Sequence, residues 1–250
     1  MTERKIIKAG LLGLGTVGTG VYKLAKRQKE EIEKKTGVSL QIEGILVHNI
    51  EKKREGVDPS LLTDNYRDLT GNEEISVIIE VMGGIEPAYT FVRQSLEAGK
   101  SVATSNKALV AKHGASLLKL AKEKNVNFLF EASVGGGIPI LRPLHSSLTG
   151  DVIEEITGIL NGTTNYMLTK MFYEGADYEE VLKEAQDNGY AERNPEADVE
   201  GYDACRKIAI LSSIISGQQV DFEDIYCEGI TKITVEDMKY AKRSEERRVG

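Results

Sequence analysis

A carboxylate and an ammonium lie four residues apart in the stretch GYDACRK at 201–207, as Asp203 and Lys207. On a helix this spacing places both side chains on one face, where they can pair. The following residues, 208–215, are so rich in apolar side chains that the predicted helix is apolar over most of its circumference, which indicates burial. Two interpretations stay open: a helical ion pair, and an acid–base pair in which the lysine passes protons.

An acidic stretch precedes this pair, with Arg193 as its one base between residues 187 and 203. A cluster of carboxylates favours a ligand with a cationic group, such as an amine, although a solvated loop is the alternative. The carboxylates of this stretch are Asp187, Glu192, Glu196, Asp198, Glu200 and Asp203.

A GxGxxG pattern, GLGTVG at 13–18, stands between a predicted strand and a predicted helix. Glycines at these positions permit a tight turn and a close approach of the backbone to a pyrophosphate, which then lies at the helix N-terminus. The pattern predicts a dinucleotide site, with a purely structural turn as the alternative.

The end of the second predicted strand, Val47-His48-Asn49, lacks the acidic residue that an NAD site uses for the ribose. The basic residues Lys52, Lys53 and Arg54 follow and could meet a 2′-phosphate, but a solvated basic turn explains them as well. NADP is therefore favoured, and NAD stays an alternative.

Two further motifs follow predicted strands. Lys107 lies in TSNKAL at 104–109, at the edge where doubly wound sheets bind ligands, although a helix cap by Ser105 or Asn106 also explains this polar cluster. Glu131 opens EASVGGGIP at 131–139, whose three glycines indicate a close backbone approach or a hinge between domains. Carbonyls with one carboxylate could also hold a hard cation.

These residues require a scaffold that brings strand ends together. Buried strands are predicted at 6–12, 40–47, 76–81, 101–104 and 127–131. Helices are predicted between them at 16–35, with Val17, Val21 and Leu24 inward, at 87–99 and at 107–124. This alternation predicts an α/β fold with a doubly wound parallel, Rossmann-like sheet over residues 1–132.

From residue 133 a second, α+β domain is predicted, with a strand at 152–160 and helices at 178–188 and 203–216. The bulk properties suit a small-molecule enzyme: a net charge of −7 argues against nucleic acid or an anionic membrane as the partner. No apolar run reaches the length of a membrane span, and the two cysteines fit neither a zinc spacing nor a disulfide framework. The expected location is the cytoplasm.

Taken in order over about residues 6–242, the motifs resemble the homoserine dehydrogenase family. The blocks that carry this resemblance are GLGTVG at 13–18, SNKAL at 105–109, EASVGGGIP at 131–139, GILNGTTNY at 158–166, and GYAE at 189–192 with DVEGYDACRK at 198–207. The resemblance implies NAD(P)-dependent interconversion of L-homoserine and L-aspartate 4-semialdehyde, on the route to threonine, methionine and isoleucine.

The resemblance also implies residue roles. Lys207 would be the acid–base lysine, Asp203 its orienting partner, Glu192 the anchor of the substrate ammonium and Asp198 a support of that pocket. In the other domain Lys107 would lie near nicotinamide and substrate. The cofactor would be held by Gly13, Gly15, Thr16, Val17 and Gly18. A monovalent cation, sodium in the family, would be bound by Glu131 and the carbonyls of Val134, Gly136 and Ile138.

Two departures from the family pattern bear on these expectations. His48 stands where many members have an arginine, which leaves NADP and NAD both open. Family chains continue beyond residue 242, usually as homodimers or tetramers, so the substrate domain at 133–242 is expected to be incomplete and residues 243–250, which fit no predicted element, to be a non-native tail. The alternative function is a non-catalytic dinucleotide-binding fragment.

Overall fold

The structure, a computed structural model, describes residues 5–248, with side chains described up to residue 243. Two compact units divide the chain. The first comprises the residues up to Thr149 together with Ser216–Gln219, and the second comprises Gly150–Ile215 and the residues from Val220 onward.

A six-stranded parallel sheet forms the centre of the first unit, with strand order β3-β2-β1-β4-β5-β6. Its strands are β1 (Lys5–Leu12), β2 (Val38–Leu46), β3 (Leu62–Thr63), β4 (Ile75–Glu80), β5 (Ser101–Thr104) and β6 (Phe128–Leu129). Continuous apolar runs suit strands that are covered on both faces, and Leu11, Ile45 and Ile78 are fully buried. The predicted doubly wound sheet is confirmed.

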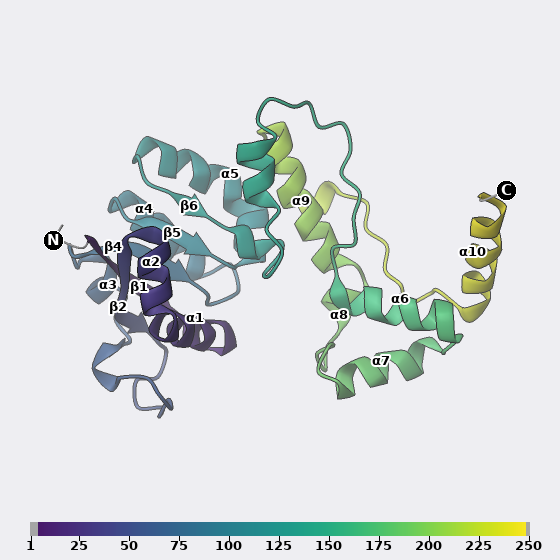
Figure 1. The fold of residues 1–250 in the computed structure, drawn as a ribbon, viewed down its shortest axis with the longest axis horizontal. Coiled ribbons are helices and arrows are strands. Elements are labelled where there is room, and N and C mark those ends of the chain that lie inside the picture. The colour runs from purple at the N-terminus through teal and green to yellow at the C-terminus, as the bar shows by residue number, and fades with distance from the viewer. Residues whose placement is uncertain (1–4, 249–250) are drawn as a thin grey trace. The chain divides into compact units, whose positions relative to one another are not determined.

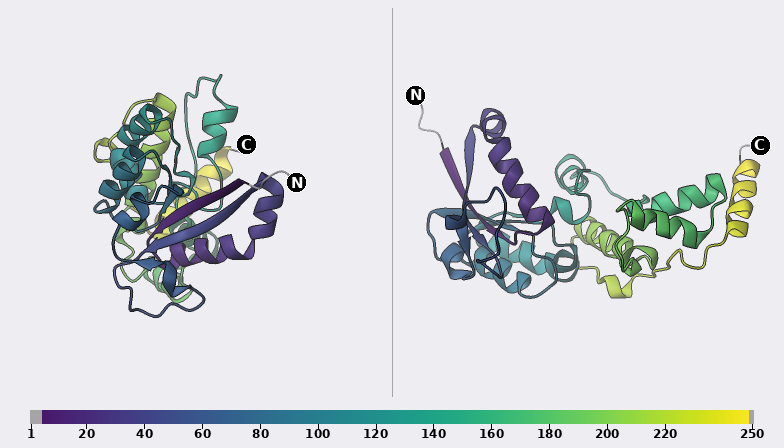
Figure 2. Two further views of the ribbon diagram at one scale, coloured as in Figure 1. Left: turned by 90° about the vertical axis from the view of Figure 1, so that its left-hand side faces the viewer. Right: turned by 90° about the horizontal axis from the view of Figure 1, so that it is seen from below.

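Helices cover both faces of this sheet. They are α1 (Thr16–Arg27), α2 (Lys29–Thr36), α3 (Arg67–Thr70), α4 (Ala88–Glu97) and α5 (Lys107–Glu123). From β1 the chain moves outward to β2, whereas from β4 it moves the opposite way to β5. Right-handed crossovers therefore place α1 and α2 on one face and α4 and α5 on the other, as the views of the first unit in Figures 1 and 2 show.

The helix predicted at 16–35 differs in two respects. It divides at Gln28 into α1 and α2. Of the three residues predicted to face inward, Val21 packs against the buried core, but Val17 and Leu24 are 53% and 51% exposed. Gly18 sets the orientation: a Cβ there would lie 2.2 Å from the Gly13 carbonyl oxygen, so residue 18 must face the turn after β1. Positions four and seven residues later, Tyr22 and Ala25, are then the buried ones.

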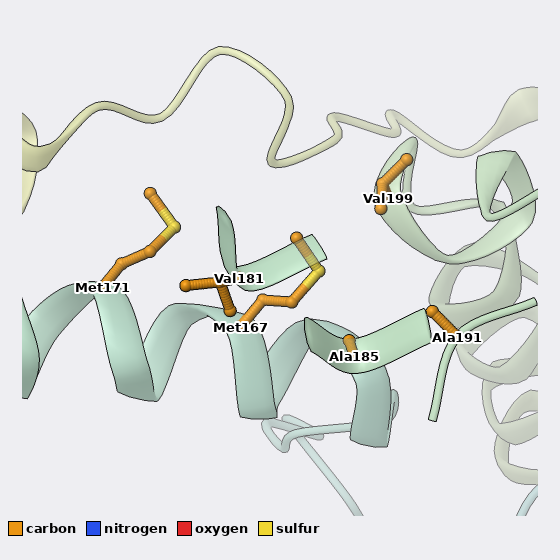
Figure 3. Packing of buried hydrophobic residues seen from close by; sticks show 6 residues of the cluster. All are labelled: Met167, Met171, Val181, Ala185, Ala191 and Val199. Carbon is orange, nitrogen blue, oxygen red and sulfur yellow. The ribbon is translucent and has the colours of Figure 1, made fainter. Parts of the chain in front are cut away.

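The second unit is helical. Its helices are α6 (Gly162–Glu174), α7 (Tyr178–Asp187), α8 (Glu196–Val199), α9 (Tyr202–Ser216, of which the last residue belongs to the first unit) and α10 (Val235–Arg248). A small core joins α6, α7 and α8, as Figure 3 shows. It consists of Met167, Met171, Val181, Ala185, Ala191 and Val199. Asn161 caps the start of α6 and Asp177 the start of α7, each through a side-chain oxygen.

The strand predicted at 152–160 is wrong: this segment runs as irregular chain (Figure 1). The β-branched residues of this segment favour a strand, but a strand also needs a neighbour for its backbone hydrogen bonds, and among residues 5–248 the only sheet lies in the first unit. Val152 and Ile159 are accordingly 89% and 78% exposed.

The expectation that residues 243–250 fit no element is also wrong for 243–248, which continue α10. Arg and Glu are good helix formers, so a helix that has begun at Val235 can extend through them. Residues 249–250 lie outside the described part. Within that part, no helix combines the length and the apolar character that crossing a membrane requires.

Candidate functional site

The ammonium of Lys207 lies between two acceptors in the second unit. Its Nζ is 2.8 Å from Asp203 Oδ2 and donates to the Leu160 carbonyl oxygen at 2.6 Å. The side chains of Lys207 and Asp203 are only 15% and 13% exposed, which excludes an ordinary surface ion pair. The predicted pair therefore exists, and it sits where water has limited access.

Helix α9 positions this pair. Asp203 and Lys207 stand one turn apart near its start, and Ala209, Ile210 and Leu211 behind them are buried. Burial of the apolar side chains fixes how the helix is rotated, and with it the direction in which the ion pair points. The predicted helix is confirmed, and its predicted burial holds for these three residues, whereas Ile208, Ile214 and Ile215 are half-buried.

Asp198 joins the pair through a residue that had no predicted role, Asn161. The Asn161 Nδ2 donates to Asp198 Oδ1 at 2.7 Å and to Asp203 Oδ2 at 3.0 Å. An asparagine just before a helix is a recognisable cap signal, and Asn161 Oδ1 does accept from the Thr164 amide at 2.8 Å. The sequence gives no sign that the other end of the same amide reaches two carboxylates 37 and 42 residues away.

Glu192 lies on a loop that is tied to the start of α6. Thr163 Oγ1 donates to the Tyr190 carbonyl at 2.8 Å, and the Tyr166 and Tyr190 rings meet edge to face with centroids 5.1 Å apart. The Glu192 carbonyl accepts from Gln186 Nε2 at 3.1 Å, while its side chain is exposed. Glu192 thus comes from the same group of elements as the ion pair, with a carboxylate open to solvent.

In the first unit, the glycine turn after β1 leaves room for a ligand. Gly13 has φ +97°, a conformation that favours glycine, and Gly18 is needed for the close approach of α1 to the turn. Gly15 is different: a Cβ there would meet no atom within 4 Å. Gly15, Thr16 and Val17 are all exposed at the N-terminus of α1, which attracts anions.

A buried carboxylate organises the neighbouring strand ends. Glu80, fully buried at the end of β4, accepts from the Met82 amide at 2.7 Å and from the Thr104 hydroxyl. Thr104 Oγ1 in turn accepts from the Asn106 amide at 2.9 Å, and Asn106 caps α5 by accepting from Leu109 N at 3.1 Å.

Lys107 follows as the first residue of α5 and is half-buried. The cap explanation for Asn106 is correct, and it also fixes where Lys107 begins its helix, at the carboxyl edge of the sheet. Glu80 was missed because a glutamate at a strand end has no distinctive pattern.

The basic residues after β2 are partly engaged with their own loop. Arg54 Nη1 donates to the carbonyls of Asn49 and Lys52, at 2.9 and 2.8 Å. Asn49 Oδ1 accepts from the amides of Glu51 and Lys52, at 2.9 and 3.1 Å. This leaves a folded turn whose Lys52 and Lys53 side chains are exposed.

The Glu131 carboxylate caps a helical turn. Oε1 accepts from the amides of Ile140 and Leu141, at 2.5 and 2.8 Å, and Oε2 accepts from the Arg142 amide at 2.9 Å. Between them the chain doubles back, so that the Ile138 carbonyl oxygen would lie 2.5 Å from a Cβ at Gly135. Among the described side chains, residues 5–243, no group of three His, Cys, Asp or Glu could hold a metal ion.

Comparison with known proteins identifies both units. Residues 13–131 match the family model "Homoserine dehydrogenase, NAD binding domain", and residues 139–248 match "Homoserine dehydrogenase". The chain is 47% identical over 240 residues to homoserine dehydrogenase of Bacillus subtilis, covering 96% of this chain and 55% of that protein. It therefore spans about half the length of the curated relatives that it matches.

Solved structures agree. The crystal structure of a homoserine dehydrogenase from Thiobacillus denitrificans matches with a TM-score of 0.88 and 44% identity, over 96% of this chain and 56% of that one. A hyperthermophilic archaeal homoserine dehydrogenase in complex with NADPH matches with a TM-score of 0.77 and 28% identity, over 92% and 76%.

Proposed function

The chain belongs to the homoserine dehydrogenase family, and from this premise we propose that it takes part in NAD(P)-dependent interconversion of L-homoserine and L-aspartate 4-semialdehyde. The observation that carries the proposal is the placement of Lys207, whose ammonium is held by Asp203 and by the Leu160 carbonyl in a site with little access to water.

Lys207 supplies the proton of the proposed reaction. A bound nicotinamide would deliver or accept the hydride. As hydride reaches the aldehyde carbon, negative charge develops on the aldehyde oxygen, and an ammonium within hydrogen-bond reach stabilises that charge and then gives up its proton. Asp203, 2.8 Å from Nζ, orients the ammonium until the transfer. In the reverse direction Lys207 takes the proton from the homoserine hydroxyl.

Glu192 and Asp198 bind the amino-acid end of the substrate in this proposal. The exposed Glu192 carboxylate is able to meet the substrate ammonium. Asp198, held by Asn161 at 2.7 Å, supports the same side of the pocket. The acidic stretch at 187–203 would then bind the cationic end of the substrate.

NADP is the proposed cofactor, with NAD as the alternative. Gly13, Gly15 and Gly18 form the turn, Thr16 and Val17 line it, and the N-terminus of α1 receives the pyrophosphate. Three observations support NADP. Positions 48 and 49 are histidine and asparagine rather than acids, Lys52 and Lys53 are exposed, and the archaeal relative is in complex with NADPH. Lys107, at the start of α5 on the same sheet edge, would contact nicotinamide and substrate.

A monovalent cation, sodium by the family resemblance, fits the loop that Glu131 opens. Three of the roughly four lone-pair positions of the Glu131 carboxylate accept backbone amides, and the remaining one can face a cation. The glycine at 135 allows the Ile138 carbonyl to turn back into the loop. The carbonyls of Val134, Gly136 and Ile138 would complete an all-oxygen set suited to a hard cation.

Three further proposals concern the whole chain: a domain boundary near residue 132, from the change of pattern along the sequence; assembly as a homodimer or tetramer, from the family resemblance alone; and a cytoplasmic location, from the apolar run lengths and the two cysteines. Sedimentation of the purified chain would test the second of these.

Substitution of Lys207 tests the proposed function. With homoserine and NADP, followed by nicotinamide absorbance, Lys207→Ala should lower turnover by about 10²–10⁴-fold and leave NADPH binding unchanged. Lys170→Ala is the matched control, because Lys170 pairs with Glu184 at 2.6 Å in the same unit but away from Lys207. Equal turnover in Lys207→Ala and the parent would overturn the mechanism, and NADPH binding without turnover in the parent would favour a dinucleotide-binding role for this polypeptide.

A further inference from the structure

One side-chain amide lies between two carboxylates of the second unit. Asn161 is only 8% exposed, and its Nδ2 donates one N–H to Asp198 Oδ1 at 2.7 Å and the other to Asp203 Oδ2 at 3.0 Å. The two acids come from different helices, α8 and α9, while Asn161 immediately precedes α6. The amide therefore connects the start of α6 with α8 and with the start of α9, through one carboxylate of each.

The orientation of this amide is fixed by its other end. Oδ1 accepts from the Thr164 amide at 2.8 Å and from Thr164 Oγ1 at 3.0 Å. A backbone N–H can only donate, so the oxygen must face α6 and the NH₂ group must face the acids. All four hydrogen-bonding positions of the amide are then used, two as donor and two as acceptor.

Two carboxylates that approach the same nitrogen repel each other when both carry charge. The amide donates one N–H to each of them and so offsets this repulsion. Asp203 Oδ2 receives the Lys207 ammonium as well, and Lys207 also donates to Leu160, the residue before Asn161. Residues 160 and 161 thus hold both members of the ion pair.

We propose that Asn161 is a positioning residue, which holds the Asp198 and Asp203 carboxylates side by side and thereby holds Asp203 against Lys207. Its effect on turnover rests on the proposed function, whereas its effect on the two carboxylates does not. The charged groups that face the amide are Asp198 from α8 and Asp203 and Lys207 from α9. The loop that carries Tyr190 faces α6 through the neutral Tyr190 carbonyl, which accepts a hydrogen bond from Thr163 Oγ1.

The variant Asn161→Asp tests this proposal. It keeps the size of the side chain and the cap of α6, since aspartate caps as well as asparagine, but it replaces the NH₂ donor by a third carboxyl group. Flanked by two acids, the new carboxyl has a folded-state pKa above its unfolded value of about 3.9. The folded state then binds the extra proton more tightly, so the variant is most stable at low pH and loses stability as the pH rises.

Urea unfolding of the parent and of Asn161→Asp, measured from pH 5 to pH 8, gives the readout. Relative to the parent, the folding equilibrium constant of the variant should fall by up to about tenfold for each pH unit until the new group has ionised. Where the variant does not fold at pH 8, refolding on transfer to pH 5 is the expected result. A difference from the parent that stays constant from pH 5 to pH 8 would overturn the proposal.

A compensating variant and a control complete the experiment. Asn161→Asp combined with Asp198→Asn restores one amide and two carboxylates, and it should remove most of the pH dependence; failure to do so also overturns the proposal. Asp177→Ala removes a cap from α7, where Asp177 Oδ1 accepts from Glu179 N at 3.0 Å, and should cost the same stability at every pH in this range. These measurements need no turnover, so they stand even if the proposed function fails.

Discussion

At the scale of single residues, Glu80 is the group on which the carboxyl edge of the sheet depends. It is fully buried and accepts from Met82 N and from the Thr104 hydroxyl, and so connects the chain after β4 with the chain after β5. Glu80→Gln presents an NH₂ group to one of these donors, which leaves a buried polar hydrogen without an acceptor. We expect the free energy of unfolding to fall by about 1–3 kcal/mol in urea titrations.

The control is Glu74→Gln. The Glu74 side chain is 67% exposed and pairs with Lys8 at 2.7 Å, so its loss should change the unfolding free energy by less than about 1 kcal/mol. Equal effects of the two variants would show that the Glu80 contacts contribute nothing beyond a surface charge.

Residues differ in how far sequence could anticipate their roles. Asp203 and Lys207 were predictable as neighbours because helical spacing alone brings them together. Gly13, Gly15 and Gly18 were predictable as a group because their spacing between a strand and a helix is the pattern of a dinucleotide site. Asn161 and Glu80 were not, since each acts on residues more than twenty positions away that only the folded chain brings close.

At the scale of elements, two glycines at the start of α1 have separable roles: Gly15 immediately before the helix and Gly18 in its first turn. A Cβ at Gly18 would lie 2.2 Å from the Gly13 carbonyl oxygen, whereas a Cβ at Gly15 would meet no atom within 4 Å, and Gly15 has an ordinary φ of −80°. Gly18→Ala should therefore lower the unfolding free energy by about 1–3 kcal/mol, the range of overpacking.

Gly15→Ala is the matched partner of that variant. It should leave urea stability within about 0.5 kcal/mol of the parent but weaken NADPH binding at least tenfold in fluorescence titrations, because the methyl group would occupy space through which the backbone approaches the pyrophosphate. Unchanged NADPH affinity in Gly15→Ala would mean that the ligand does not approach the turn at this residue.

The helical turn that Glu131 caps should respond to acid. Burial raises the pKa of Glu131, but the backbone amides of Arg142, Ile140 and Leu141 lower it by more, so the folded-state pKa lies below the usual range. A depressed carboxyl pKa contributes stability that is present above the unfolded value, about 4.3, and is lost as the pH falls through the folded value.

Glu131→Gln should accordingly destabilise the chain by about 0.5–2 kcal/mol at pH 7, as for a lost cap, with the difference from the parent shrinking below about pH 4. The exposed Glu123→Gln serves as the control in the same urea series. A Glu131→Gln effect that persists undiminished at pH 3 would contradict the cap.

A strand could be predicted from the sequence where the strands that pair with it could be predicted as well. The strands of the first unit follow one another and pair with near neighbours in the sheet, so apolar runs between helices identified them. At 152–160 the β-branched composition also favoured a strand, but no second strand of that unit pairs with this segment among the described residues. Helix α1 was placed correctly, yet its rotation followed from Gly18, which periodicity alone does not reveal.

At the scale of the whole molecule, each compact unit has its own buried core: Leu11, Ile45 and their neighbours in the first, Met167, Met171 and theirs in the second. Chains built from two such units need not unfold in one step. Ligands that bind only one folded unit stabilise that unit by mass action, by about 2.7 kcal/mol when their concentration is 100 times Kd.

Calorimetry of the chain should therefore resolve two unfolding transitions. NADPH should raise the midpoint temperature of only one of them, because all the proposed cofactor residues lie in the first unit. The transitions are assigned with two variants: Glu80→Gln should lower the one that NADPH raises, and Met167→Ala, at a fully buried position, should lower the other by about 2–5 kcal/mol of unfolding free energy. A single transition that both variants lower equally would show that the two units unfold together. If NADPH instead shifted only the transition that Met167→Ala lowers, the cofactor would bind the second unit, which would contradict the proposed cofactor site.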